Sequence, residues 1–224
     1  MCGRFSLVYT KGFEKRFYLP EKTGLKPRFN IAPGQETLVI IKNNRRKLAL
    51  MNWGLLPHWV KDSSKSYKSI NARVESIDSK PYFRIPFLRQ RCLVPASGFY
   101  EWEKIGRKEK KPHYIRLKEQ DFFSMAGLFD VWEGKEGKIN NFTIVTVEPN
   151  KLIGEIHGRM PAILDKQKEA VWLDENSQKQ DLLSLLKPYD SSMMEAYAVS
   201  KKVNNTENDS KELLQKIEQQ GCLL

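Results

Sequence analysis

The chain has 224 residues, of which 40% are hydrophobic and 11% aromatic, which is enough for one well-packed core. Lys and Arg outnumber Asp and Glu by 38 to 27, and the resulting net charge of +11 favours a polyanionic partner. No stretch approaches the ~20 consecutive apolar residues that cross a bilayer and the N-terminus lacks the apolar run of a signal peptide, so we expect a soluble, cytoplasmic protein that is nucleoid-associated if bacterial.

Hydrophobic periodicity predicts strands where β-branched and aromatic residues gather, and helices where apolar residues recur three and four apart. The expected elements are, in chain order, a helix at 10–18, strands at 37–41, 47–53 and 91–102, an exposed hairpin loop at 104–112, strands at 113–117, 123–132 and 142–147, helices at 149–156, 166–173 and 179–186, a strand at 195–199 and a helix at 210–219. Because strands follow one another through the middle of the chain, the sheet should be largely antiparallel and barrel-like. We therefore expect an α+β fold with short flanking helices in a single domain, 1–224, with a core at about 2–209 and a C-terminal helix and tail at 210–224.

The three cysteines are Cys2, Cys92 and Cys222, an odd number with no close pair. This spacing provides neither a disulfide framework nor a Cys-x-x-Cys metal or redox site. Cys92 lies in an apolar run and is expected in the core, whereas Cys222 belongs to a short tail. We expect no organic cofactor and no metal.

Cys2 follows the initiator Met1, and cysteine is small enough at this position for the methionine to be trimmed. Trimming would leave an amine and a thiol on one residue, with reference pKa values of ~8 and ~8.5. Together these groups condense with an aldehyde, first as an imine and then as a five-membered thiazolidine. Taken alone, Cys2 is more simply a small residue near a terminus, so further motifs are needed.

Five further clusters mostly mix Gly or Pro with a polar residue among apolar neighbours, as expected where a loop at a sheet edge presents a side chain. The clusters lie at 30–34, 53–59, 70–75, 97–102 and 157–161. At these clusters, at Met1-Cys2-Gly3-Arg4 and at 199–205, the chain resembles the SRAP family, whose members crosslink themselves to abasic sites in single-stranded DNA. The match covers nearly the whole chain with the motifs in the family order, and this order carries the resemblance because each motif is weak alone.

The resemblance implies roles for Cys2 as the crosslinking nucleophile, Asn71 as the amide that positions the N-terminal residue and the sugar, and Glu101 and His157 as an acid–base pair. An abasic deoxyribose is mostly a closed hemiacetal, so a proton donor and acceptor near its ring oxygen would speed opening to the aldehyde. Glu101 lies between two aromatic residues, where desolvation should favour its neutral form. From the residues alone, Glu101 could instead be a solvated strand residue, His157 a helix cap and Asn71 a turn residue.

The resemblance also implies a set of DNA-contacting residues. Three arginines beside the expected site suit the phosphates that flank the lesion, namely Arg4, Arg73 and Arg159. Three apolar residues match family positions near the lesion, where flat groups stack on bases or hold the strand kinked, namely Pro33, Trp53 and Trp59. The arginines could instead pair with local carboxylates such as Glu75, and Trp53 could equally belong to the core. Val60 stands where the family often carries a further aromatic residue.

The sequence therefore predicts a monomeric protein of the DNA damage (SOS) response that binds single-stranded DNA and captures abasic sites as a thiazolidine on Cys2. AP-lyase activity at the imine stage and self-processing peptidase activity at Met1 are accompanying expectations. One alternative is an N-terminal-nucleophile hydrolase, amidotransferase or peptidase, in which the thiol attacks an amide. Another is a noncovalent single-strand binder whose basic surface follows the DNA backbone.

Overall fold

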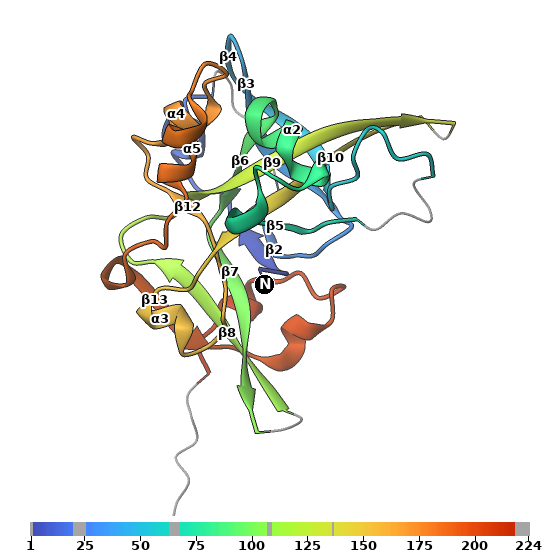
Figure 1. Cartoon of the computed structure of the whole chain (residues 1–224). Coiled ribbons are helices and arrows are strands. Elements are labelled where there is room, and N and C mark those ends of the chain that lie inside the picture. Colours follow the sequence, from blue (N-terminus) through green and yellow to red (C-terminus); the bar gives the residue numbers. More distant parts are fainter. Residues whose placement is uncertain (1, 20–25, 63–67, 107–108, 136, 218–224) are drawn as a thin grey trace, which may run out of the picture.

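The computed structural model describes residues 2–19, 26–62, 68–106, 109–135 and 137–217, and strands are their main regular structure (Figure 1). The strands are, in chain order, β1 (Phe5–Leu7), β2 (Arg28–Ile31), β3 (Glu36–Asn43), β4 (Arg45–Trp53), β5 (Asn71–Arg73), β6 (Arg91–Ala96), β7 (Gly98–Ile105), β8 (Glu109–Leu117), β9 (Phe123–Gly134), β10 (Gly137–Val147), β11 (Met160–Pro161), β12 (Ile163–Leu164) and β13 (Met194–Ala198). The helices are α1 (Phe13–Phe17), α2 (Pro81–Arg89), α3 (Lys151–Gly154), α4 (Glu169–Leu173) and α5 (Lys179–Leu185). This inventory confirms the predicted α+β fold with short helices.

Five strands close into a barrel in the order β4–β3–β6–β9–β10, and β10 returns to β4 to complete the ring. Every neighbouring pair in the ring is antiparallel except β10 and β4, which run parallel. β5 also pairs in parallel with β10, and this pairing sets Asn71 beside Ile144 and Arg73 beside Thr146. The largely antiparallel, barrel-like core is therefore confirmed.

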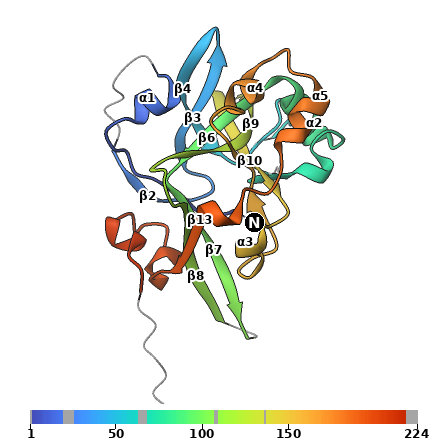
Figure 2. The same cartoon turned by 90° about the vertical axis from the view of Figure 1, so that its left-hand side faces the viewer.

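A second sheet lies beside the barrel in the order β13–β8–β7–β1–β2, with every pair antiparallel. In Figures 1 and 2 its β7–β8 hairpin points away from the barrel end that carries α4 and α5. The two strands of this hairpin stay paired as far as Ile105 and Glu109, so most of the loop predicted at 104–112 is strand. Residues 107–108 lie outside the described ranges.

The single strand predicted at 91–102 is wrong, because β6 belongs to the barrel and β7 to the second sheet. The chain bends at Ser97, whose N–H donates to the Ser6 carbonyl at 2.8 Å and whose Oγ accepts from the Val8 N–H at 2.9 Å. Gly98 follows the bend, and the Tyr114 ring lies so close that a Cβ at position 98 would be 2.3 Å from its Cζ. A small residue at this bend therefore lets the chain pass from one sheet to the other.

One hydrophobic core is shared by the barrel and the second sheet. Phe5 of β1 meets Trp53 of β4 edge to face with ring centroids 5.2 Å apart, and Trp53 stacks on Phe142 of β10 at 6.3 Å. Edge-to-face and stacked aromatic pairs stabilise by about 0.5–1.5 kcal/mol each beyond the area they bury. These contacts fix β1, and with it the segment that begins at Cys2, against the barrel.

The predicted helices are present at four of five places but are mostly shorter than their apolar patterns. The helix predicted at 210–219 is wrong within the described residues: Lys211–Leu214 forms one 3-10 turn and Lys216 bridges to Val199. Leu213 packs instead into a small cluster with Tyr100 and Tyr114 on the outer face of the second sheet. Tertiary packing thus overrides the local helical pattern in this segment.

α2 was not predicted, although Pro81 opens it and Phe83 and Phe87, four residues apart, bury its inner face. Among the described residues, no helix combines the length and apolar character needed to span a membrane.

Candidate active site

Cys2 stands just before β1, where the second sheet meets the barrel, and its side chain is completely buried. The strand that follows is fixed on both sides, because Phe5 pairs with Phe99 of β7 and with Ile31 of β2. Burial raises the pKa of the Cys2 thiol well above its ordinary value, so the sulfur is a neutral thiol at pH 7. Met1, whose predicted removal would create the amine, lies outside the described residues.

Asn71 opens β5 and holds the main chain of Cys2. Its Nδ2 donates to the Cys2 carbonyl at 3.0 Å and to the Ile70 carbonyl at 2.7 Å. Its Oδ1 is buried and has no hydrogen-bond partner within the described ranges. An amide with committed donors and an uncommitted acceptor is suited to receive an N–H or O–H from a reacting group beside Cys2.

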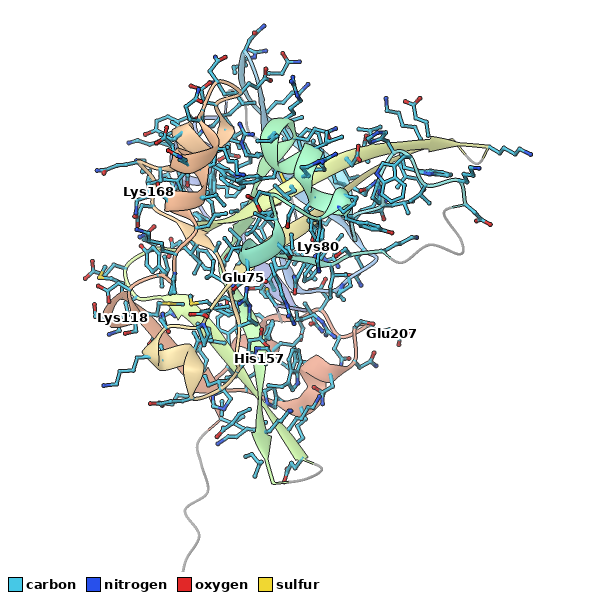
Figure 3. The ribbon with its side chains drawn as sticks, in the orientation of Figure 1. Glu75, Lys80, Lys118, His157, Lys168 and Glu207 are labelled. Atoms are coloured by element: carbon cyan, nitrogen blue, oxygen red, sulfur yellow. The ribbon has the colours of Figure 1, made fainter. Side chains whose placement is uncertain are left out.

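Glu101 and His157 approach each other from different elements. Glu101 lies on β7 with 2% of its side chain exposed, and His157 follows α3, where its N–H donates to the Ile153 carbonyl at 2.8 Å. The distance from His157 Nδ1 to Glu101 Oε1 is 3.9 Å. The Glu101 charge also adds to the raised pKa of the Cys2 thiol after burial, which places the carboxyl near the sulfur. Figure 3 shows His157 beside the upper part of the β7–β8 hairpin.

The two groups have complementary protonation. Burial raises the pKa of Glu101 from 4.5 to about 7, which confirms the desolvation predicted for this carboxyl. Burial lowers the pKa of His157, so its ring is neutral at pH 7. His157 Nδ1 lies 3.1 Å from both the N–H and the carbonyl oxygen of Arg159, which fixes the orientation of the ring. Glu101 can therefore both give and take a proton near neutral pH, beside a neutral imidazole.

A groove of about 590 Å³ opens beside Asn71, between the loop that carries Trp59 and the start of α2. Its lining combines aromatic, basic and polar residues, namely Trp59, Ser69, Asn71, Arg73, Lys80, Pro81, Tyr82 and Phe83. Trp59 is 50% exposed and its ring meets Tyr82 edge to face with centroids 5.5 Å apart. Exposed aromatic faces next to cationic side chains are typical of surfaces that bind single-stranded nucleic acid. Of the predicted DNA contacts, Trp59 and Arg73 therefore lie on one accessible surface.

Arg4 is half-buried rather than extended into solvent. Its Nη1 donates to Asn30 Oδ1 at 2.8 Å and to the Val203 carbonyl at 2.6 Å, and its guanidinium lies 5.8 Å from the Trp102 ring centroid. Burial lowers the pKa of Arg4 below its ordinary value. One edge of this predicted phosphate ligand is thus already committed to the protein.

Arg159 forms a bidentate ion pair with Glu75, with nitrogen–oxygen distances of 2.5 and 3.0 Å. This is the pairing with a local carboxylate that the sequence left open as an alternative to phosphate binding. Its Nη2 also donates to the Thr146 carbonyl at 2.7 Å, and only 13% of the side chain is exposed. The hydrogen bond from Arg159 lowers the pKa of Glu75. Any contact between Arg159 and a phosphate must therefore compete with this carboxylate.

Trp53 and Pro33 occupy different environments. Trp53 is 1% exposed and its Nε1 donates to the Ile70 carbonyl at 2.9 Å, so the structure places it in the core, where its ring offers no face to a base. Pro33 is exposed in the turn between β2 and β3. Trp53 supports the neighbouring residues of the site through packing rather than by stacking on DNA.

Thr146 is a candidate site residue that the sequence did not reveal. It pairs with Arg73 across β10 and β5, its carbonyl binds Arg159, and its buried Oγ1 has no hydrogen-bond partner within the described ranges. A buried hydroxyl of this kind costs free energy unless a ligand or water satisfies it. The only sequence signal was its place in an apolar strand, where a hydroxyl is unexpected. Within the described residues, no three His, Cys, Asp or Glu side chains gather closely enough to hold a metal ion.

Comparisons with known proteins match nearly the whole chain. The chain is 43% identical over 223 residues to the protein named abasic site processing protein YoqW of Bacillus subtilis, covering 96% of this chain and 99% of that one. It is 34% identical to the abasic site processing protein HMCES of Xenopus tropicalis, covering 84% of this chain and 66% of the relative. A crystal structure of a Bacteroides thetaiotaomicron protein has the same fold with a TM-score of 0.88 at 29% identity, covering 97% of this chain and all of that one. The family model described as SOS response associated peptidase (SRAP) matches residues 1–206, and the chain therefore belongs to the SRAP family.

Proposed function

We propose that this protein captures abasic sites in single-stranded DNA covalently, through the amine and thiol of Cys2 after Met1 has been removed. The names of its relatives support abasic-site DNA as the substrate. The observation that carries the reaction is the meeting of Cys2, Asn71 and the Glu101–His157 pair beside a groove lined by aromatic and basic side chains.

The first step opens the sugar. Neutral Glu101 protonates the ring oxygen while the neighbouring base, His157, removes the hydroxyl proton at C1′. The bond between C1′ and the ring oxygen then breaks, which yields the aldehyde. The Cys2 amine then adds to C1′, and loss of water forms an imine. Because burial keeps the thiol protonated, the amine is the better first nucleophile.

Ring closure follows when the Cys2 sulfur adds to the imine carbon and the thiol proton passes to the nitrogen. The overall change joins one aldehyde and one cysteine as a thiazolidine with loss of one water, and it consumes no further reagent. The adduct protects the lesion from strand cleavage as part of the DNA damage response. At the imine stage, proton removal from C2′ would instead allow β-elimination, which accounts for the expected AP-lyase activity.

The family description names a peptidase, and cleavage of the Met1–Cys2 bond by the protein itself is the smallest activity of that kind. Attack on an amide by Cys2 requires a thiolate, and the raised pKa of the buried thiol disfavours it. Addition of the Cys2 amine to an aldehyde requires no thiolate. The basic groove likewise fits DNA better than a small amide substrate, which favours crosslinking over amidotransferase activity.

The test is a denaturing gel of purified protein, shown by intact mass to lack Met1, mixed with a single-stranded oligonucleotide that carries one abasic site. Without a reductant, wild type should give a heat-stable shifted band, and Cys2→Ala should give none. Cys2→Ala and Cys2→Ser both keep the amine but cannot close the sulfur-containing ring, so any band from either should require reduction with borohydride. Equal trapping by Cys2→Ala, or release of ammonia from glutamine by wild type, would contradict the proposal.

A further inference from the structure

Asn30 joins the N-terminal segment to the C-terminal part of the described chain. It lies in β2 and is completely buried. Its Oδ1 accepts from Arg4 Nη1 at 2.8 Å, and its Nδ2 donates toward the carbonyls of Val203, Asn205 and Asn208 at 3.3, 3.0 and 2.7 Å. An amide has two N–H donors, so the three carbonyls share them and both polar atoms of the Asn30 side chain are used.

Arg4 connects Asn30 to the reacting residues. It follows Cys2 by two positions, and its carbonyl accepts from the Tyr100 N–H at 2.9 Å, one residue before Glu101. Its Nη1 is held by Asn30 and by the Val203 carbonyl. Its Nε is buried and has no hydrogen-bond partner within the described ranges. The guanidinium is therefore anchored at Nη1, while its buried Nε lacks an acceptor.

A second tie holds the same C-terminal segment against β2. The Asp209 carboxylate accepts from the N–H groups of Phe29 and Asn30, the latter at 3.0 Å, and pairs with Arg28 Nε. Earlier in the same segment, Asn204 Oδ1 accepts from Trp102 Nε1 at 2.8 Å. Residues 203–209 are thus fixed at several points around Arg4, although Arg4 is far from them in the sequence.

We infer that Asn30 is a positioning residue for the crosslinking reaction, which orients Arg4 so that its guanidinium binds a phosphate of the DNA strand at Cys2. This inference rests on the proposed function. With Nη1 bonded to Asn30 and Val203, the guanidinium cannot rotate without breaking two partly buried hydrogen bonds, so its charge is oriented before DNA arrives. Residues 203–209 help to orient Arg4 as well, because carbonyls of this segment accept hydrogen bonds from both Asn30 and Arg4.

A purely structural role for Asn30 predicts a different result, namely lower stability with an unchanged rate in folded protein. Arg91 provides a matched control for that case. It is 5% exposed and donates to three main-chain carbonyls, those of Trp172, Phe87 and Asp174, at 2.7, 2.8 and 2.6 Å. It lies on β6 and ties α2 to Trp172 of α4 and to Asp174 just after that helix.

The experiment measures the first-order rate of crosslink formation at saturating abasic oligonucleotide, with folding of each variant checked by circular dichroism and thermal melting. Asn30→Ala should slow the rate about tenfold, as expected for misplacement of a group that orients the substrate, whereas Arg91→Gln should lower Tm but keep the wild-type rate. In an Arg4→Gln background, Asn30→Ala should cause little further loss, because both changes remove the same phosphate contact.

If Asn30→Ala does not fold, Asn30→Leu replaces it, since leucine keeps the approximate size of the buried side chain but removes the acceptor that holds Arg4. A rate below wild type for folded Asn30→Leu supports the inference. A wild-type rate in the folded Asn30 variant, or losses that multiply in the double variant, would overturn it. Failure of the proposed function is distinct, because wild type itself would then give no crosslinked band.

Discussion

At the scale of single residues, Glu101 is the group whose chemistry depends most on its surroundings. Its folded pKa of about 7 lies above the ordinary value of 4.5, because burial penalises the carboxylate. The folded protein therefore holds this proton where the unfolded chain has lost it, and stability falls as the pH rises from 4.5 to about 7. The difference of 2.5 pKa units corresponds to a loss of up to about 3 kcal/mol above that range.

Glu101→Gln should therefore be more stable than wild type at about pH 8 and nearly equal to it at about pH 4, as measured by urea denaturation. The same variant should crosslink more slowly, because the amide has no acidic proton to donate for ring opening. Glu133→Gln is the matched control, since Glu133 is 69% exposed on β9 and should alter neither quantity. A Glu101→Gln protein that loses stability at the higher pH would show that the buried carboxylate is favourable as an ion.

The site residues differ in how far sequence could predict them. Cys2, Asn71, Glu101 and His157 stand in short motifs, and the structure brings them together at one place. The sequence allowed Glu75 as a partner of the arginines, and Arg159 takes it, whereas the contact of Arg4 with the carbonyl of Val203 could not be predicted because Val203 is distant in sequence. The same reason hid Thr146 and the contacts of Asn30, although Asn30 opens the cluster at 30–34, because their polar groups gain significance only from what lies beside them after folding.

At the scale of elements, strand length decided what could be predicted. β3, β4, β9 and β10 are eight or more residues long, so their periodicity indicates them from sequence. β1 and β5 have three residues each, too few for a periodic pattern, although they place Cys2 and Asn71. The break between β6 and β7 also escaped prediction, since both sides are apolar and the bend depends on two different partner strands.

The close packing at Gly98, where β7 begins, leads to a prediction about stability. Gly98→Ala should destabilise the protein by about 1–3 kcal/mol, because the added methyl meets the Tyr114 ring, which is itself hydrogen-bonded to Ser6 at 2.8 Å. Chemical denaturation measures the loss. Gly158→Ala is the control for stability, since a Cβ there would have no atom within 4 Å. Equal stability of the two variants would mean that the second sheet adjusts freely at this bend.

At the scale of the whole molecule, the net charge of +11 acts on DNA through the groups that reach the bound strand. Arg73 and Lys80 are exposed along the groove, whereas Lys168 lies beside α4, away from Lys80 in Figure 3, and pairs with Asp165. Removing a charge that contacts a phosphate should lower both the affinity and its dependence on salt, while removing a remote charge should change neither much. Comparing variants of these three residues therefore distinguishes local phosphate contacts from a general attraction between a basic protein and DNA.

Arg73→Gln and Lys80→Gln should each reduce the slope of log affinity against log salt concentration by about 0.7, the value for one phosphate contact on single-stranded DNA. Noncovalent binding is measured with intact single-stranded DNA, so that crosslinking does not contribute. Lys168→Gln should keep the wild-type slope. If all three variants lower the slope equally, the groove beside Asn71 is not the path of the strand. A decrease confined to Arg73 and Lys80 places the strand along Trp59 and Tyr82, with the reacting sugar at Cys2.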